Sequence, residues 1–396
     1  MDLEASSRAR RLAIVVSHPI QYYVPLYRRL AKRDNLQLRV FFTWHAAAAA
    51  QYDPGFAQEV AWDIPLTDGY EYEVVTNVSS RPGSDHFSGI RNPDLVRRVL
   101  NWKPDAVHIT GYAYASHLRA MRAFHKLGIT VLFRGDSHLL DQRRGVGWQL
   151  KRLALGRIYK WPTACLYVGK HNYDYYRELG VPDSRLFYCP HSIEVERFSE
   201  PNEEFEKQAS AWRKEQRIPD EARVVLFAGK FEPKKRPLEL MDTVARIQDR
   251  HLVLVMVGNG ELEGEVRRIA NQSPDKFRIL PFQNQSIMPV VYRVGDIFVL
   301  PSAYNETWGL GANEALACGR PVIVSDKVGC APDLGKVAGD NCKVFRVDDW
   351  EDFQAKLKSL LDHRIDRARL RDCARNFDIP ATESALVAAL QQAVFK

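Results

Sequence analysis

The sequence predicts an α/β protein made of two Rossmann-like domains that face each other across a cleft. Its 396 residues are enough for two domains, and the 45% that are hydrophobic are enough for two cores. Short β-branched or aromatic runs alternate with amphipathic helical stretches, which is typical of parallel sheets covered by helices on both faces. This alternation starts again at Arg223, so we expect the second half to repeat the architecture of the first.

The expected strands are short apolar runs, and the expected helices lie between them. In the first half the strands are Leu12–Val16, Leu38–Thr43, Ala106–Thr110, Thr130–Arg134, Cys165–Val168 and Leu186–Cys189. In the second half they are Val224–Ala228, Leu252–Val257, Phe277–Leu280, Ile297–Leu300 and Val322–Val324. The clearest helices are Pro93–Leu100, Ala115–Leu127, Glu261–Asn271 and Asp352–Leu361. Open sheets of this kind bind ligands outside the carboxyl ends of their strands, so polar loops that follow strands are the candidate sites.

A charged and weakly apolar stretch, Glu200–Glu221, separates the two halves. We therefore place the boundary near Ser199, with one domain over residues 1–199 and a second over residues 200–379. The remaining residues, 380–396, contain an expected helix, Pro380–Phe395, that crosses back to the first domain. The alanine run Ala46–Ala50 is assigned no role.

The excess positive charge lies in the first half of the chain. The net charge is +7, and residues 1–200 hold 27 Lys and Arg against 20 Asp and Glu, whereas the remainder is balanced. We expect this half to meet an anionic membrane surface, a phosphorylated acceptor or a nucleic acid. Nucleic acid is the least favoured, and we expect none, because the chain has no polybasic block, RNA-recognition signature or helix-turn-helix pattern.

Composition favours a cytoplasmic location. No run of 18 apolar residues occurs, and the first residues, Met1–Glu4, include early acids and no apolar signal segment. The six cysteines form no C-x-x-C pair and no zinc spacing, which is typical of reduced thiols. The alternative location is peripheral, at the inner face of the membrane with weak association.

Residues 143–157 mix basic side chains with Trp148 and leucines at helical spacing. This pattern fits an interfacial membrane helix, or a surface helix whose apolar stripe faces the core. We favour the surface helix.

Two glycine-containing turns in the second half are suited to phosphate. Gly229 follows a buried strand and allows close backbone approach, and Lys230 and Lys235 add two cations on the same loop. Such cations suit a diphosphate whose leaving charge must be neutralised. Gly258 lies in a V-G-N-G turn from a strand into a helix, a common phosphate or hydroxyl cradle. A solvated basic loop and a plain connection are the alternatives for these two segments.

A third stretch, residues 301–315, follows the strand Ile297–Leu300 and opens a helix. Its glycines leave backbone N–H groups free at the helix start. Glu306 precedes this helix and Glu314 lies about one turn inside it. Carboxylates accept hydrogen bonds from the vicinal hydroxyls of a sugar or a ribose. The alternative for Glu314 is complementation of the helix dipole.

Together these stretches resemble the donor site of the retaining GT-B glycosyltransferases of family 4. That family has a glutamate, an F-G-L-like turn, a second glutamate eight positions on, and then A-x-A-C-G-x-P-V. Here residues 306–310 read E-T-W-G-L and residues 314–322 read E-A-L-A-C-G-R-P-V. The family's upstream G-R-L…E-K-G corresponds to G-K-F at residues 229–231 and K-K-R at residues 234–236. The resemblance covers the second half well and the first half only in outline.

The resemblance implies a role for each matching residue. Lys230 and Lys235 would neutralise the diphosphate, and Glu306 would hold the sugar, so all three count as catalytic candidates. The candidate donor-binding residues are Gly229, Gly258, Phe282, Thr307, Trp308, Gly309, Leu310 and Glu314. Of these, the backbone of residues 308–310 would hold the sugar, Glu314 the ribose, and the loop near Phe282 the base. Two departures affect the phosphate grip, since Lys230 replaces an arginine and Arg236 replaces a glycine.

The resemblance also implies a reaction without a bound cofactor. A nucleotide sugar would be the co-substrate, and a hexose would pass with retention of configuration to a glycan, a lipid-linked acceptor or a small molecule. No D-x-D occurs in the chain. Because two lysines take the place of metal charge, we expect no metal site.

The loop after the first strand supplies candidate acceptor-binding residues, His18, Gln21 and Tyr22. In the resembled family this loop is usually glycine-rich and borders the acceptor and the donor phosphates. Here side chains would replace those backbone contacts. The alternative is a turn packed by its aromatic residues.

A second polar loop follows the strand Thr130–Arg134. In the family a histidine often lies near this point, and here Gly135 takes its place. Arg134, Asp136 or His138 would then supply the contact. We count Arg134 and Asp136 as catalytic candidates and His138 as an acceptor-binding candidate.

Two other functions compete with glycosyl transfer. A nucleotide-sugar epimerase or phosphorylase could use the same fold, but an epimerase needs further acid and base residues around the sugar, and none is found. A non-catalytic nucleotide-sugar-binding protein would be expected to lack the set formed by Lys230, Lys235, Glu306 and Glu314, and this set is present.

Overall fold

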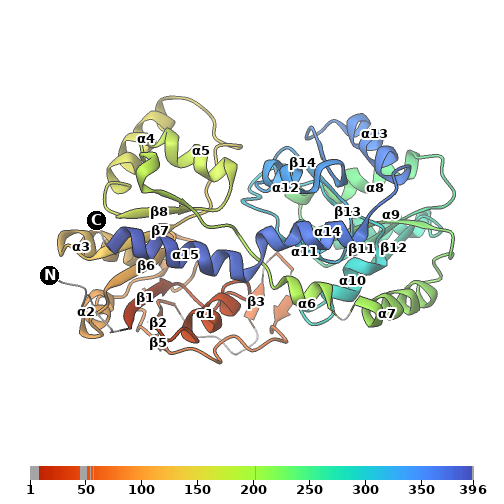
Figure 1. Ribbon diagram of the computed structural model, residues 1–396. Coiled ribbons are helices and arrows are strands. Elements are labelled where there is room, and N and C mark those ends of the chain that lie inside the picture. The colour runs from red at the N-terminus through yellow and green to blue at the C-terminus, as the bar shows by residue number, and fades with distance from the viewer. Residues whose placement is uncertain (1–8, 45–50, 54, 57, 201, 395–396) are drawn as a thin grey trace. The chain divides into compact units, whose positions relative to one another are not determined.

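The computed structural model describes residues 9–44, 51–53, 55–56, 58–200 and 202–394, and it divides into two compact units (Figure 1). Described residues of the first unit come from 1–48, 65–190 and 379–396, and those of the second from 49–64 and 191–378. This division differs from the boundary expected near Ser199, because residues 191–199 and the described residues between 51 and 64 lie in the second unit. Ala46–Ala50 lies outside the described residues.

The first unit is built on a parallel seven-stranded sheet in the order β5-β2-β1-β6-β7-β8-β9. Its strands are β1 (Arg10–Val16), β2 (Leu36–Phe42), β5 (Tyr72–Val74), β6 (Ala106–Thr110), β7 (Thr130–Arg134), β8 (Ala164–Tyr167) and β9 (Leu186–Tyr188). All were expected except the short edge strand β5. The order reverses at β1, which pairs with β2 on one side and β6 on the other.

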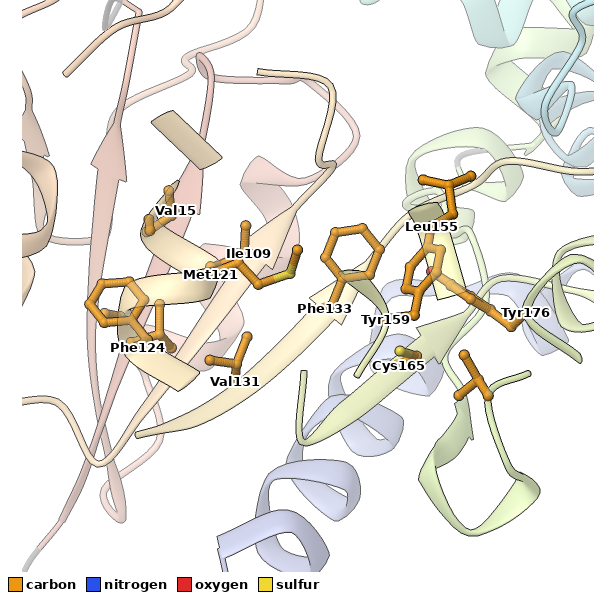
Figure 2. Close-up of a cluster of buried hydrophobic side chains, with 14 of the residues drawn as sticks. Val15, Ile109, Met121, Phe124, Val131, Phe133, Leu155, Tyr159, Cys165 and Tyr176 are labelled. Atoms are coloured by element: carbon orange, nitrogen blue, oxygen red, sulfur yellow. The ribbon is translucent and has the colours of Figure 1, made fainter. Parts of the chain in front are cut away.

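Helices cover both faces of this sheet because its strands are apolar on both faces. They are α1 (Val24–Ala31), α2 (Leu95–Asn101), α3 (Ala115–Lys126), α4 (Val146–Ile158), α5 (Lys170–Glu178) and α15 (Ile379–Val394). One core joins alternate strand residues to α3, α4 and α5, and Figure 2 shows part of it, including Phe133, Leu155, Tyr159 and Tyr176. A second core on the other face packs α1 and α15 against Leu12, Ile14 and Leu132, among others.

The last helix, α15, belongs to the first unit and packs on α1, β7 and β8 (Figure 1). Glu383 of α15 is 6% exposed and accepts hydrogen bonds from Arg29 at 2.6 Å and Arg33 at 3.0 Å. Arg29 on α1 and Arg33 just after α1 therefore compensate the one buried carboxylate of α15.

The second unit contains a parallel six-stranded sheet in the order β12-β11-β10-β13-β14-β15. Its strands are β10 (Arg223–Ala228), β11 (Leu252–Val257), β12 (Phe277–Leu280), β13 (Ile297–Leu300), β14 (Val322–Ser325) and β15 (Cys342–Phe345). In sequence terms the order is 3-2-1-4-5-6, the order of dinucleotide-binding folds. The order reverses between β10 and β13, which are neighbours in the sheet. The two Rossmann-like units expected from the sequence are therefore confirmed.

Nine α-helices of the second unit are described. They are α6 (Val195–Ser199), α7 (Asn202–Glu215), α8 (Pro237–Arg246), α9 (Glu263–Gln272), α10 (Met288–Val294), α11 (Leu310–Ala317), α12 (Ala331–Ala338), α13 (Trp350–Leu361) and α14 (Arg367–Ala374). On one face, α8, α9 and α13 pack on the sheet around Phe227, Leu254 and Val299. On the other face, α10 packs against α7 and α11 against α14.

Helix α7 is tied to this second face by ion pairs. Glu206 accepts hydrogen bonds from Arg320 at 2.8 and 3.0 Å and lies 3.6 Å from the guanidinium of Arg293. The side chains of Arg293 and Arg320 are 0% and 2% exposed. Apart from Glu206, the hydrogen-bond acceptors that the structure shows for these two arginines are uncharged. Arg293 donates to the carbonyl of Pro289, and Arg320 donates to that of Gly295. Glu206 is therefore a main source of negative charge for two buried cations.

A segment from the first half of the sequence also lies in the second unit. Strands β3 (Gln51–Asp53) and β4 (Gln58–Val60) form an antiparallel pair. The chain after them stays on this unit, since Asn284 donates to the carbonyl of Ala61 at 2.6 Å and the amide of Ser286 donates to Asp63 at 3.1 Å. No sequence pattern predicted this placement.

Candidate functional site

Two charged side chains meet where the strand order of the second sheet reverses. Lys235 lies in a short 3-10 turn, Pro233–Lys235, after β10, and Glu306 lies in the loop after β13. Their side chains form an ion pair, and each is 15% exposed. Loops that follow the two central strands of such a sheet leave toward opposite faces, which opens the ligand-binding crevice. These two residues, singled out from separate motifs, therefore lie at the position where this fold binds ligands.

The surroundings of Glu306 keep its carboxylate ionised. Burial by itself would raise the pKa of Glu306, but the Lys235 ammonium and a hydrogen bond from Ser302 at 2.8 Å outweigh burial and lower the pKa below its ordinary 4.5. A lowered pKa means that the ionised form stabilises the fold above that ordinary value, and that this contribution is lost as pH falls through the lowered pKa. Glu306 is thus a charged acceptor at neutral pH, fixed in place by a lysine and a hydroxyl.

The glycine turns after β10 and β11 pack directly against each other. The Gly229 amide donates to the carbonyl of Val257 at 2.9 Å, and the Phe231 amide donates to that of Asn259 at 2.8 Å. Gly258 has a φ of +149°, and a Cβ on it would lie 1.9 Å from the Gly229 carbonyl oxygen. Because no side chain fits there, Gly258 is required for packing, whether or not its turn also binds phosphate.

After Glu306, the loop between β13 and α11 turns its largest side chain, that of Trp308, into the core. Trp308 is 3% exposed, and its indole donates to Asn313 at 3.2 Å, so its ring is part of the core. Gly309 is the N-cap residue of α11 and has a φ of +93°, and a Cβ there would lie 2.7 Å from Leu300. Thr307 is exposed, and Leu310 is half-buried. Use of the backbone of residues 308–310 to hold the sugar stays a prediction.

Glu314 lies on α11 and is 2% exposed. The hydroxyl of Tyr292, on α10, donates to its Oε2 at 2.6 Å. The carboxylate is therefore fixed by a neighbouring helix, a contact that no motif indicated.

Phe282 lies in the loop after β12, where Asn259 accepts a hydrogen bond from its amide at 2.6 Å. Its ring contacts Phe56 edge to face, with the ring centroids 4.5 Å apart. Phe56 also lies under Lys230, whose ammonium is 4.8 Å from the centroid of the ring. Within the second unit, Phe56 thus contacts one donor-binding candidate, Phe282, and one catalytic candidate, Lys230.

In the first unit, the loop after β1 carries the acceptor candidates His18, Gln21 and Tyr22, all half-buried. His18 Nδ1 is 2.9 Å from the Ser17 hydroxyl, and its ring meets Trp44 edge to face. Since β1 is the strand at which the order of this sheet reverses, the loop occupies the position where ligands bind in such folds.

Arg134, at the end of β7, is 4% exposed. It donates to the Cys189 sulfur and to the Pro190 carbonyl, both at 2.9 Å, and its guanidinium lies 5.7 Å from the centroid of the Tyr23 ring. These contacts favour a positioning role for Arg134, in which it holds the chain segment that leaves the first unit.

Asp136 and His138 follow Arg134 and are half-buried. The amide of Leu140 donates to His138 Nδ1 at 3.3 Å. Helix α5 fixes the loop between them, because Asn172 donates to the carbonyl of Ser137 at 2.7 Å. Asp136 and His138 therefore lie at the carboxyl edge of the sheet, on a loop that a hydrogen bond from α5 holds in place.

Four further side chains belong to the candidate site and were not assigned a role from the sequence. They are Ser302, Tyr292, Asn259 and Phe56. The first and third lie in motifs already singled out, so their position beside a strand end was a usable signal. Tyr292 and Phe56 lie in other segments, and only the three-dimensional fold brings them to the site. Among the described residues, no group of three or more His, Cys, Asp or Glu side chains is placed to hold a metal ion.

Residues 208–377 match the family described as glycosyl transferases group 1. A D-inositol 3-phosphate glycosyltransferase of Geodermatophilus obscurus is 30% identical over 226 residues, which are 53% of this chain and 48% of that protein. One of Corynebacterium glutamicum is 29% identical over 238 residues, 57% of this chain and 54% of that protein. The chain therefore spans about half the length of the curated relatives it matches.

Solved structures with the same fold match nearly the whole chain. A glycosyltransferase from Rickettsia africae has a TM-score of 0.70 at 12% identity and covers 98% of this chain and 99% of its own. HepE from Anabaena, in complex with UDP, has a TM-score of 0.71 at 14% identity and covers 96% of this chain and 99% of its own. The family match over residues 208–377 confirms the resemblance to a glycosyltransferase family that the sequence motifs indicated. The solved structures confirm the GT-B type of fold.

Proposed function

We propose that the protein is a retaining, metal-independent glycosyltransferase that takes a sugar from a nucleotide-sugar donor. The observation that carries the proposal is the Lys235–Glu306 pair at the strand-order reversal of the second sheet. It sets a cation and an ionised carboxylate side by side, on the loops that follow two neighbouring central strands. A nucleotide sugar needs these groups together, because its diphosphate is anionic and its sugar presents hydroxyls.

Each predicted donor residue then has a task. Lys235 and Lys230 neutralise the diphosphate as the glycosidic bond breaks, and Glu306 accepts hydrogen bonds from the sugar. Glu314 holds the ribose, with Tyr292 fixing its carboxylate. The base lies against Phe282. A phosphate that reaches Lys230 takes the place of the Phe56 ring, since a full anion binds an ammonium more strongly than an aromatic face does.

The first unit supplies the acceptor side. His18, Gln21, Tyr22 and His138 are its candidate contacts, and Asp136 is the remaining acid or base candidate there. The acceptor is a glycan, a lipid-linked sugar or a small molecule. The matched relatives are named as D-inositol 3-phosphate glycosyltransferases, and a phosphorylated acceptor would suit the basic first half. We propose a cytoplasmic location, with weak peripheral association at the inner face of the membrane.

Turnover and stereochemistry test the proposal together. A thermal-shift screen of nucleotide sugars identifies the donor, and that donor is then assayed with candidate acceptors in excess chelator. We expect full turnover in chelator and a first-formed product that keeps the anomeric configuration of the donor by NMR. Strict dependence on added magnesium would refute charge neutralisation by lysine. An inverted anomer would refute retention and make Asp136 or His138 the leading base candidate.

Glu314→Ala is expected to weaken donor binding about tenfold or more, because a hydrogen bond to a charged group is worth about 1.5–3 kcal/mol. Calorimetry with the nucleotide portion of the donor measures the effect. Tyr292→Phe is the companion variant, since it keeps the carboxylate and removes only the hydroxyl that fixes it. It should weaken binding less than Glu314→Ala. Unchanged affinity in Glu314→Ala would remove the ribose role.

A further inference from the structure

Helix α4 (Val146–Ile158) has apolar side chains on two opposite faces. Its inner face carries Trp148 and Leu155, both 5% exposed, and Figure 2 shows Leu155 in the core with Tyr159, which follows the helix. Its outer face carries Val146, Leu150 and Leu153, which are 79%, 65% and 56% exposed. These three positions are spaced by four and three residues, so they form one stripe along the helix. A stripe of large apolar side chains directed at solvent is a feature that the fold of the first unit does not use.

Basic side chains surround this stripe. Residues 142–160 contain six Lys and Arg and no Asp or Glu. Among the described residues, no ion-pair partner is found for Arg143, Arg144, Lys151 or Lys160. Arg152 is paired with Glu178 of α5, but at 3.4 Å and with both side chains partly exposed. The apolar stripe therefore lies within a strongly positive field.

A groove of about 470 Å³ runs along the side of the helix. Its lining includes Arg152, Arg157, Lys160 and Arg185 against a single acid, Glu178. It opens next to Leu153, which lines it as well. A cationic groove beside an exposed apolar stripe is the arrangement that an anionic head group and its acyl chain require, because one end of that ligand is charged and the other is apolar.

We propose that the outer face of α4 docks the first unit on an anionic lipid bilayer. The stripe Val146, Leu150 and Leu153 enters the boundary between head groups and acyl chains, and the flanking bases and the groove bind lipid phosphates. A second copy of the chain is a poor occupant because two such faces would repel each other. Nucleic acid is also a poor occupant, because the stripe offers aliphatic side chains and no exposed aromatic ring on which bases could stack. The described residues contain no helix long and apolar enough to cross a membrane, so this helix would lie in the plane of the surface.

This inference stands apart from catalysis and is tested without it. The full chain is sedimented with vesicles of phosphatidylcholine alone or mixed equally with phosphatidylglycerol, at low and high salt. We expect binding to the anionic vesicles at low salt, weaker binding at high salt, and at least tenfold weaker partitioning for Leu150→Ser combined with Leu153→Ser. Charge removal by Arg143→Gln, Arg144→Gln and Lys151→Gln together should abolish the preference for anionic lipid while leaving the apolar contact.

Leu127→Ser is the matched control. Leu127 is 58% exposed in the same unit but lies after α3, away from the basic segment. It should bind vesicles as the unchanged protein does. All these side chains are exposed, so thermal unfolding should stay the same and exclude misfolding as a cause. The proposal fails if the double serine variant partitions like the unchanged chain, if no binding occurs at low salt, or if the variant loses only a concentration-dependent self-association measured by sedimentation velocity.

Discussion

Glu206→Ala is expected to lower the free energy of unfolding of the second unit by about 3 kcal/mol. Breaking a buried ion pair by removing one partner typically costs about 3–5 kcal/mol, because the remaining charge stays buried without compensation. Here one carboxylate serves two guanidinium groups, those of Arg293 and Arg320, which are almost fully buried. We expect a value near the lower end because the Glu206 side chain is 32% exposed, so water can partly replace it. Denaturant unfolding followed by circular dichroism measures the change.

A control on the same helix separates this effect from a general loss of helix stability. Glu203→Ala, in the first turn of α7, removes an exposed carboxylate and is expected to change stability by less than about 0.5 kcal/mol. Glu206→Gln keeps the shape of the side chain and should still lose most of the stability, since the charge is what the arginines require. If Glu206→Gln were as stable as the unchanged chain, hydrogen bonding alone would hold α7, and the charge argument would be wrong.

The central strands could be predicted from the sequence because they are buried on both faces. β11 (Leu252–Val257) is buried along its whole length, and such a run leaves few alternatives to a parallel strand. Two strands at sheet edges, β5 and β15, could not be predicted in this way. β15 (Cys342–Phe345) contains a lysine and two half-buried positions, and β5 (Tyr72–Val74) has only three residues, two of them exposed. A strand this short, or with only its ends buried, carries a weak apolar signal in the sequence.

The same reasoning explains which parts of the candidate site were predictable. Lys235 and Glu306 are 71 residues apart, yet each lies in the loop after a central parallel strand, and parallel strands bring their carboxyl ends to one edge. Their meeting thus follows from the fold class. Phe56 does not follow a strand of that sheet, and its contact with Phe282 depends on a segment packing on a distant part of the chain. Periodicity and motif spacing contain no information about such packing.

Lys235→Ala is expected to lower turnover by about 10²–10³-fold at saturating donor, with a smaller change in donor affinity. As the bond to phosphate breaks, negative charge builds on the diphosphate, and a preplaced cation gains most at that point. Removing one such group typically costs about 10²–10³-fold in turnover. The structure adds a second consequence. Without Lys235, the largest contribution that lowers the pKa of Glu306 is gone, so that pKa rises and the residual activity should increase with pH.

Lys234→Ala is the matched control for this prediction. Lys234 is the preceding residue on the same loop, and it pairs with Glu232 at 3.0 Å rather than with Glu306. Its loss removes the same charge from the same segment but leaves the Lys235–Glu306 pair in place, so turnover should change less than about tenfold. Initial rates over a range of donor concentrations and pH values separate turnover from affinity in both variants. Normal turnover of Lys235→Ala at saturating donor would exclude the leaving-group role. Equal losses in both variants would mean that the total charge of the loop matters, and that the position of Lys235 beside Glu306 does not.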